Sequence, residues 1–205
     1  MAINHDPADA ENVAQFWKNV LDDSIPQNAM NDTNGNLWAR AQGGNPDILY
    51  FAGNDKQNHN RSNIPPVPPG KRLFVAVNPV EVTDFEVAAE AVPDKDLANN
   101  ARKDEDSASK ADLIINTQQI DLIARKYRRA NGDFQINAPP PGTLWGIPNG
   151  SHHASADGYY IIIEPLDPGD YTMVIDAQVD KPFPFKQSGA WTSKVTYKFK
   201  VVGPQ

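Results

Sequence analysis

The chain has 205 residues, a formal net charge of −7 and no cysteine. The lack of cysteine excludes disulfides, thiolate metal sites and cysteine nucleophiles. The acidic balance argues against a nucleic-acid or anionic-membrane partner. Hydrophobic residues make up 40% and charged residues 22%, as is typical of a globular protein. Proline occurs 18 times, against roughly ten at average usage, and this density favours a loop-rich β protein because proline breaks helices.

The N-terminal segment predicts one amphipathic helix over residues 8–22. Asp6-Pro7 is typical of a helix start, with a carboxylate at the N-cap and proline at the first helical position. Apolar residues then recur every three or four positions, until Ile25-Pro26 ends the pattern. No basic segment followed by an apolar run precedes this helix, so the sequence predicts no signal peptide.

Two short apolar segments of the first half predict strands, at Ile48–Phe51 and Leu73–Val77. The intervening residues 54–70 are polar and then proline-rich, and they predict a long surface loop. Residues 85–107 contain good helix formers interrupted by Pro93, so a short helical insertion is expected there.

Residues 111–129 fit two structures. Their apolar positions could form one stripe of a helix, but Leu113-Ile114-Ile115 could equally form a strand. Periodicity alone cannot decide between them for so short a run.

The C-terminal third predicts strands with turns between them. Tyr159–Ile163 is apolar on both faces, as expected of a central strand, but is far too short for the ~20 residues of a membrane helix. Tyr171–Val179 forms the next strand, after a turn in which Gly169 is expected to take a positive φ. In the last strand, one face is apolar and the other lysine-rich, in strict alternation. The apolar positions are Val195, Tyr197, Phe199 and Val201, and the lysines are Lys194, Lys198 and Lys200.

Taken together, these elements predict a mainly β fold formed by residues 1–205 as a single domain. We expect an antiparallel, jelly-roll-like β-sandwich with the N-terminal helix and the helical insertion added to it. No membrane insertion is expected.

The ordered motifs of this chain resemble those of a family of uncharacterised bacterial proteins that are usually secreted. The shared features are an aromatic helix ending in Ile-Pro, a strand like residues 67–78 (VPPGKRLFVAVN), an ADGYY segment at 156–160 and a PLDPGDYT segment at 165–172. The resemblance implies a strand at Leu113–Ile115 and an extracellular location. This chain departs from the family pattern in having neither a signal peptide nor cysteines, and the resemblance implies no named activity.

The most chemically suggestive cluster is His152 and His153 with Asp157. Imidazoles and a carboxylate suit a divalent metal such as zinc, copper or nickel. Adjacent strand residues point to opposite faces, so both rings could bind one metal only from a loop, and Asn149-Gly150 just before them favours a loop. A solvated loop without metal is the alternative interpretation.

Two further types of site are suggested by composition. Carboxylates near predicted strand ends could form the pair that a polysaccharide hydrolase needs; they are Glu81, Asp84, Glu86, Asp167, Asp170 and Asp176. Trp145, Trp191 and Tyr160 could instead form an aromatic platform for a glycan, although such residues are more often core.

The basic run at residues 125–129 is interpreted as a solvated edge or as a partner of the acidic Asp104-Glu105-Asp106 rather than as a nucleic-acid site. No nucleotide-binding or nucleophile motif occurs in the sequence. We therefore expect a non-catalytic binding or self-assembly protein, with self-association through a sheet edge or the proline-rich loops. A hydrolase and a metal protein are the alternatives, and no cofactor is expected apart from that metal.

Overall fold

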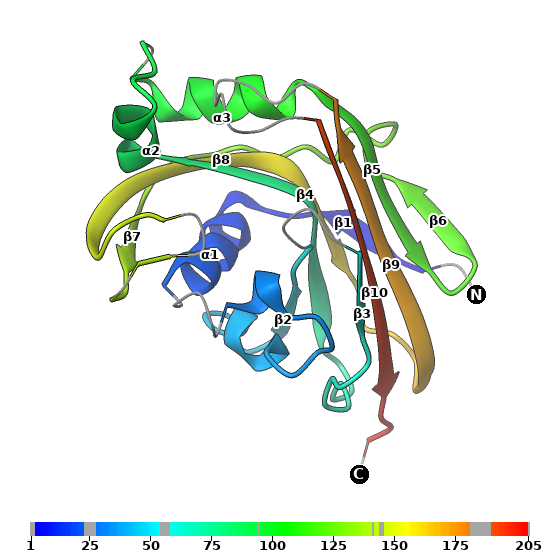
Figure 1. The fold of residues 1–205 in the computed structure, drawn as a ribbon. Helices are drawn as coiled ribbons and strands as arrows, with labels where there is room; N and C mark the ends of the chain where they lie inside the picture. Colours follow the sequence, from blue (N-terminus) through cyan, green and yellow to red (C-terminus); the bar gives the residue numbers. More distant parts are fainter. Residues whose placement is uncertain are drawn as a thin grey trace.

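The computed structural model describes residues 3–22, 28–53, 58–93, 95–140, 142–143, 146–180 and 190–204. This part of the chain is mainly β, as predicted, and forms two five-stranded sheets that pack against each other (Figure 1). The strands of sheet A are β1 (His5–Pro7), β8 (Gly150–Ile163), β4 (Arg72–Thr83) and β2 (Ile48–Phe51) in spatial order, and β7 (Asn131–Ala138) also pairs with β8. The strands of sheet B are β3 (Asn58–Arg61), β10 (Trp191–Val201), β9 (Gly169–Val179), β5 (Ala108–Ile115) and β6 (Gln118–Asp121).

Three α-helices accompany the sheets in the described residues. They are α1 (Ala10–Leu21), α2 (Asp84–Ala89) and α3 (Leu97–Glu105), and two 3₁₀ turns, η2 (Ala29–Asn31) and η3 (Trp38–Ala41), follow α1. The predicted helical insertion is confirmed by α2 and α3. Residues 111–129 contain strand rather than α-helix, since β5 and β6 pair there as a hairpin.

Most strand pairs are antiparallel, as predicted, but two pairs depart from this pattern, because β2 pairs parallel to β4 and β3 pairs parallel to β10. Parallel neighbours need a crossover connection. Here the chain leaves sheet A after β2, adds β3 to sheet B, and returns to sheet A as β4. The prediction of one long loop at residues 54–70 is therefore wrong at residues 58–61, while residues 54–57 lie outside the described part.

Sheet A forms the middle layer and is buried on both faces. Phe74 of β4 and Tyr160 of β8 belong to one apolar cluster with Phe16 and Trp17 of α1. The neighbouring positions, Leu73, Val75, Ile161 and Ile163, belong to a second cluster with the inner face of sheet B. The molecule therefore has three layers, helix α1, sheet A and sheet B, and the curved sheet A encloses α1 (Figure 1).

Helix α1 begins later than the sequence suggests. Its N-cap is Asp9, whose Oδ1 accepts a hydrogen bond from the Asn12 backbone N–H at 2.8 Å. The predicted cap, Asp6-Pro7, instead pairs with β8 at the edge of sheet A. Proline is tolerated there because an edge strand need not donate every backbone hydrogen bond, and this pairing outweighs the local helix-start pattern.

Arg61 connects the crossover to the rest of the fold. Its side chain is 1% exposed and donates to the carbonyls of Met30, Asp32 and Ala52 at 3.2, 2.6 and 2.9 Å. It also contacts the Tyr197 hydroxyl, and its guanidinium lies 5.2 Å from the centre of the Tyr197 ring. A buried cation needs several acceptors, and these come from the segments on both sides of β2 and from β10. No local pattern identified this buried arginine in advance.

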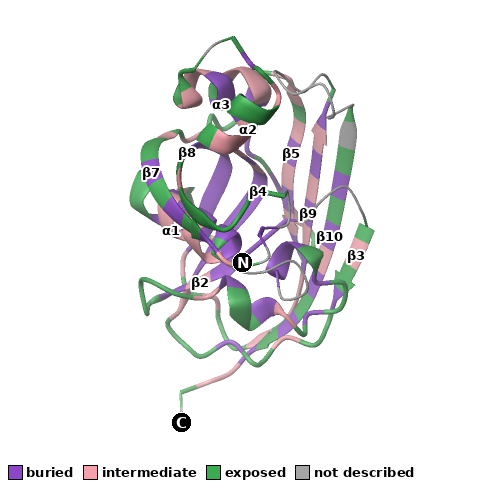
Figure 2. Ribbon diagram, turned by 60° about the vertical axis from the view of Figure 1, so that its left-hand side comes forward, coloured by how far each residue is buried: buried purple, intermediate pink, exposed green. Residues whose placement is uncertain are grey.

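The predicted alternation of the last strand is confirmed, and Figure 2 shows buried and exposed residues alternating along β10. Val195, Tyr197, Phe199 and Val201 are each 5% exposed or less, and Lys194, Lys198 and Lys200 are exposed. Phe199 packs against Phe51 and Tyr171, with ring centres 5.5 and 5.7 Å apart.

We expect Phe199→Ala to lower the free energy of unfolding by about 3–5 kcal/mol, because it leaves a cavity between the sheets. Lys198→Ala removes only solvated atoms and should change it by less than about 0.5 kcal/mol. Urea unfolding of both variants measures the difference, and equal midpoints would contradict the strand register.

The predicted positive φ at Gly169 is wrong, because this residue begins β9 without left-handed dihedrals and a Cβ there would meet nothing closer than 3.7 Å. Gly158 is the constrained position. It has φ +152°, and a Cβ would lie 2.5 Å from the Asn78 carbonyl oxygen. Gly158 lies opposite Pro79, directly after the register shift between Ala76 and Asn78 that brings the β4 backbone close.

Gly158→Ala should therefore lower the free energy of unfolding by about 1–3 kcal/mol, because backbone atoms must move to admit the methyl group. Gly169→Ala serves as the matched control and should be nearly neutral. Thermal unfolding of the two variants tests this, and a larger loss at position 169 would contradict it.

Candidate functional site

Helices α2 and α3 cover the end of sheet A that sheet B leaves open (Figure 1). A small apolar cluster holds them, formed by Val82 of β4, Val87 of α2, Ala101 of α3 and Val92 between the helices. Polar and ionisable side chains surround this cluster, among them Glu81, Glu105 and Arg128.

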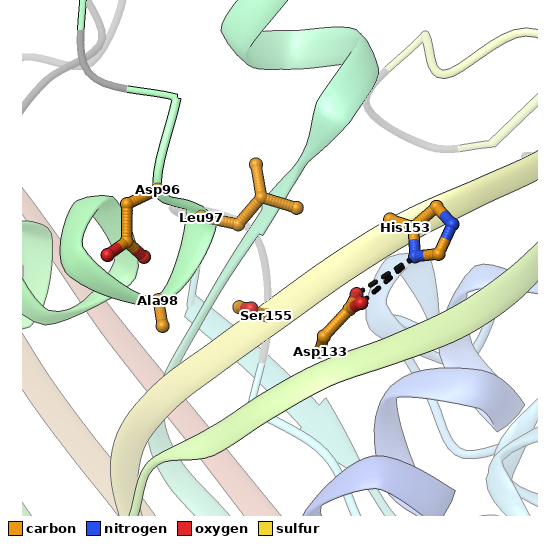
Figure 3. A pocket seen from close by; sticks show the side chains of 6 residues that line it. All are labelled: Asp96, Leu97, Ala98, Asp133, His153 and Ser155. Atoms are coloured by element: carbon orange, nitrogen blue, oxygen red, sulfur yellow. Dashed lines mark hydrogen bonds and ion pairs between the residues drawn. The ribbon is translucent and has the colours of Figure 1, made fainter.

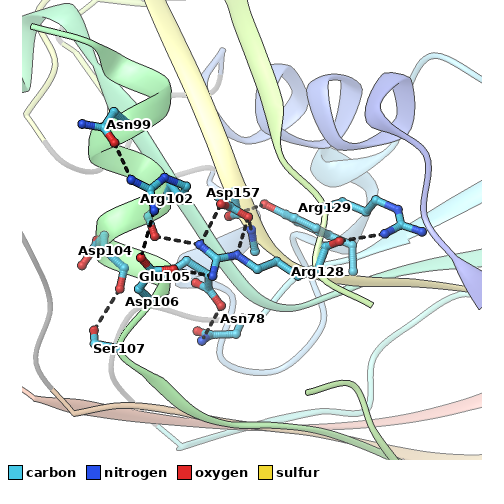
Figure 4. Close-up of polar contacts among 12 residues, drawn as sticks. Asn78, Asn99, Arg102, Asp104, Glu105, Asp106, Ser107, Arg128, Arg129 and Asp157 are labelled. Atoms are coloured by element: carbon cyan, nitrogen blue, oxygen red, sulfur yellow. Dashed lines mark hydrogen bonds and ion pairs between the residues drawn. The ribbon is translucent and has the colours of Figure 1, made fainter. Parts of the chain in front are cut away.

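Arg128 is the centre of a network between α3 and β8 (Figure 4). Its Nε and Nη2 donate to the two carboxylate oxygens of Asp157 at 3.0 and 2.8 Å. Its Nη1 donates to Asp106 Oδ1 at 2.7 Å, and Nη2 also donates to the Arg102 carbonyl at 2.7 Å. Burial lowers the pKa of Arg128, but its hydrogen bonds with Asp157 and Asp106 outweigh burial and raise it overall. The expected pairing of the basic run with the acidic segment at 104–106 is confirmed.

Glu105 lies beside this network and is 1% exposed. Its Oε1 accepts from Asn78 Nδ2 at 3.1 Å, while its Oε2 and the Asn78 Oδ1 are buried without a hydrogen-bond partner. Burial and the Asp157 carboxylate raise the pKa of Glu105 well above its ordinary value, and the nearby Arg128 only partly opposes this. Burial therefore favours the neutral acid at Glu105, because Asn78 and the nearby Arg128 compensate a buried charge only in part.

Glu81 and Glu86 form a second carboxyl pair, between β4 and α2. Glu86 Oε2 accepts from the Thr83 backbone N–H and hydroxyl at 2.9 and 2.7 Å, and closes the capping box of α2. Burial, and then the Glu86 carboxyl, raise the pKa of Glu81 well above its ordinary value, and burial also raises the pKa of Glu86. Both shifts favour a neutral acid at this pair.

These carboxyl groups contact protein rather than an open cleft. Glu81 Oε2 is shielded from solvent, and Glu105 is buried under α3. Asp84 contacts His152, and Asp167, Asp170 and Asp176 belong to β9 and the connection before it. In the described residues, the carboxylates proposed for a hydrolase thus come together only at Glu81 and Glu86, where they attach α2 to the sheet.

We expect the neutral acid at Glu105 to make stability fall with pH. The pKa of Glu105 is higher in the folded protein than in the unfolded chain. The stability that Glu105 contributes is therefore fully present below its pKa in the unfolded chain, about 4.3, and is lost as the pH rises through its pKa in the folded protein. Glu105→Gln keeps the neutral shape, so it should gain stability relative to the parent between pH 5.5 and pH 8. Urea unfolding at both pH values measures this gain.

Glu11→Gln is the control for that comparison, because Glu11 is exposed in the first turn of α1. Its effect should be the same at pH 5.5 and pH 8. A pH-independent difference between Glu105→Gln and the parent would show that Glu105 is already ionised in the folded protein.

The accessible polar feature of this region is a pocket between α3 and the β7–β8 pair, which we call the α3 pocket (Figure 3). It is lined by Asp96, Leu97, Ala98, Asp133, His153 and Ser155. Asp96 is placed there as the N-cap of α3, where its Oδ1 accepts from the Asn99 N–H at 3.0 Å. Asp133 is placed there by the register shift between Asn131 and Phe134 in the β7–β8 ladder.

His153 and Asp133 are hydrogen-bonded across this ladder. The His153 Nδ1 lies 3.0 and 3.2 Å from the two Asp133 carboxylate oxygens, and both side chains are more than half exposed. Ser155 lies two residues further along β8, on the same face. The imidazole is turned toward Asp133, and its second nitrogen points away from Ser155 (Figure 3). The three residues are therefore not arranged for proton transfer from a serine nucleophile.

The predicted metal ligands are not brought together. His152 and His153 lie in β8, not in a loop, and so point to opposite faces. The His152 ring nitrogens lie 3.1 Å from Asp84 Oδ1 and 3.0 Å from the Pro148 carbonyl. Asp157 is four strand residues from His153, about 13 Å along the strand, and pairs with Arg128. Across the described part of the chain, no group of three or more His, Asp or Glu side chains could hold a metal ion.

Of the three residues predicted to form an aromatic platform, Tyr160 is buried, and the other two side chains lie outside the described structure. Tyr160 is fully buried, where its hydroxyl accepts from Trp17 Nε1 at 3.0 Å and donates to the Asp157 carbonyl at 3.1 Å. It therefore offers no free ring face to a sugar. Trp145 lies outside the described residues, as does the side chain of Trp191.

Sequence reasoning did not single out Asp96, Asp133 or Ser155 as site residues. The Asp96-Leu97 step at the start of α3 is a recognisable N-cap signal. Nothing local distinguishes Asp133 or Ser155, because only the pairing of β7 with β8 and the packing of α3 place them together.

Comparisons with known proteins add little to this geometry. No family model matches the chain, and no curated protein matches it. Among solved structures, the solution structure of amebosin is similar over 75% of this chain and 99% of its own, at 10% identity and a TM-score of 0.18. So low a TM-score does not establish a common fold, and the resemblance to the bacterial family stays a prediction. None of the helices in the described ranges is long and apolar enough to span a membrane.

Proposed function

We propose that this chain is a non-catalytic binding module whose ligand binds in the α3 pocket. The observation that carries this proposal is the placement of carboxylates from two separate elements, Asp96 of the α3 N-terminus and Asp133 of β7, around one accessible pocket. Glu105 is buried and Glu81 Oε2 is shielded from solvent, whereas Asp96 and Asp133 are exposed at this pocket.

The pocket favours a cationic group on an aliphatic stem. Asp96 and Asp133 supply negative charge at its rim, and Leu97 with Ala98 supplies an apolar wall. A primary ammonium or a guanidinium can donate to the exposed Asp133 carboxylate while its methylene groups cover the wall. The net charge of −7 also attracts cations. Aromatic rings, on which sugars commonly stack, do not line the pocket.

The absence of a proton-transfer arrangement at Ser155 supports binding rather than acyl transfer. Catalysis by a serine needs its hydroxyl hydrogen-bonded to a base that is itself oriented by a third group. Here Asp133 does orient His153, but the ring turns away from Ser155 (Figure 3). The dyad can hold the carboxylate in place for a ligand.

A titration followed by NMR tests the proposal, with Nα-acetyl-lysine amide as the probe. We expect saturable shifts of the backbone amides at residues 96–98, 133, 153 and 155. Exposed ion pairs contribute only about 0–1 kcal/mol each, whereas a dissociation constant of about 1 mM needs about 4 kcal/mol. Binding should therefore be weak, with a dissociation constant well above about 1 mM. Asp133→Asn should weaken binding several-fold.

Two matched controls accompany this titration. Asp167→Asn removes the same charge from an exposed site before β9 and should leave binding unchanged. Nα-acetyl-norleucine amide has the stem without the ammonium group and should not bind. Equal binding to both probes, or saturable binding of an oligosaccharide at these residues in place of the lysine probe, would overturn the cationic assignment. Cleavage of a polysaccharide would overturn the non-catalytic one.

Self-association through a sheet edge stays a prediction. Four of the described edge strands, β1, β2, β3 and β6, have only three or four residues each, whereas β7, which pairs with β8, has eight. Short edge strands are a common device against edge pairing.

A further inference from the structure

The proline-rich segment at residues 64–69, which we call the proline segment, is held in place along the edge of sheet B. Val67 is 1% exposed, and its N–H donates to the Lys200 carbonyl at 2.7 Å. The Val202 N–H donates back to the Val67 carbonyl at 3.0 Å. Ile64 is partly buried against the core between the sheets. Two apolar side chains and two backbone hydrogen bonds therefore fix the segment to the protein.

The backbone of the proline segment is restricted to an extended left-handed form. Each proline sets its own φ near −65°, and each residue that precedes a proline is confined to the β or polyproline II region. Four of the six residues are prolines, at 65, 66, 68 and 69, and none of the six belongs to a helix or sheet strand. A turn at Gly70, with φ +77°, ends the segment.

Burial follows the three-residue repeat of a polyproline II helix. Ile64 and Val67, three residues apart, face the protein. Pro65, Pro66, Pro68 and Pro69 are all exposed. The four prolines thus form two parallel ridges, 65 with 68 and 66 with 69, and both ridges face solvent.

We propose that the proline segment is a docking site for a partner protein that has a groove lined by aromatic side chains. Such grooves accept two neighbouring ridges of a polyproline II helix, in a PxxP pattern. Pro65 with Pro68, and Pro66 with Pro69, each supply this pattern. Because the segment is already ordered by Val67, it loses little conformational entropy on binding, and this favours association.

Nearby charge indicates the chemistry of the rim of the partner's groove. Lys200 is the residue whose carbonyl accepts from Val67, and Lys198 lies two residues earlier in β10. Both lysines are exposed on the outer face of sheet B. An acidic rim beside the aromatic groove would complement them. This docking site is independent of the α3 pocket, which is formed by α3, β7 and β8.

Isolated SH3 and WW domains with acidic groove rims are the probes for this proposal, because both recognise polyproline II ligands. The full chain should bind at least one of a panel of such domains in a calorimetric titration. The double variants Pro65→Ala/Pro68→Ala and Pro66→Ala/Pro69→Ala should each weaken that binding by tenfold or more. Circular dichroism and thermal unfolding establish that each variant remains folded.

Pro165→Ala/Pro168→Ala is the matched control. These two prolines are also exposed and three residues apart, but they lie in the connection between β8 and β9 without neighbouring prolines. This variant should bind as the parent does. The proposal is overturned if no domain of the panel binds the parent chain, or if the control variant loses as much affinity as the two segment variants.

Discussion

The pairing of β4 with β8 is the constraint on which the rest of the structure depends. These two strands match from Leu73 with Ile163 to Thr83 with Ala154, and both of their faces carry apolar side chains. A sheet that is apolar on both faces must be covered twice, because each exposed face would cost about 25 cal/mol per Å² of apolar surface. Helix α1 covers one face and sheet B covers the other. The three-layer architecture follows from this requirement.

The two covering layers do not reach the far end of β4 and β8, and α2 with α3 complete the cover there. Val82, Val87 and Ala101 supply the apolar contact. The remaining contacts are polar, through Glu81 with Glu86, Glu105 with Asn78, and the Arg128 network. Burying neutral acids is less costly than burying carboxylates, and burial raises the pKa of both Glu81 and Glu105 at this end of the molecule. The α3 pocket lies at its outer rim.

The crossover from β2 through β3 to β4 joins the two sheets on the opposite side. Two parts of this crossover are attached to the rest of the protein, by different kinds of interaction. Arg61 is held by carbonyl groups and by Tyr197, whereas the proline segment is held by the packing and backbone hydrogen bonds of Val67. A chain that must pass from one sheet to the other and back needs such attachments, since an unattached connection of this length would be costly to order. The attachment of Val67 also leaves the four prolines facing solvent.

The sequence by itself determined the elements whose signals are local. Alternation identified β10 and its buried face, the apolar run 159–163 identified the end of β8, and helix formers around Pro93 identified α2 and α3. These patterns predict the elements correctly because each reflects which side of a strand or helix packs against the core. The mainly β class followed from them.

Only the tertiary structure decided which distant residues meet. It placed Asp6-Pro7 in a strand rather than a helix cap, buried Arg61 within a polar segment, and left Gly158, but not Gly169, without room for a side chain. It also separated His152 from His153 and brought Asp96 and Asp133 to the lining of one pocket. Each of these outcomes depends on strand register and on the partner across the sheet. Such pairings are determined by the burial of the whole sheet, and the residues adjacent in the sequence do not reveal them.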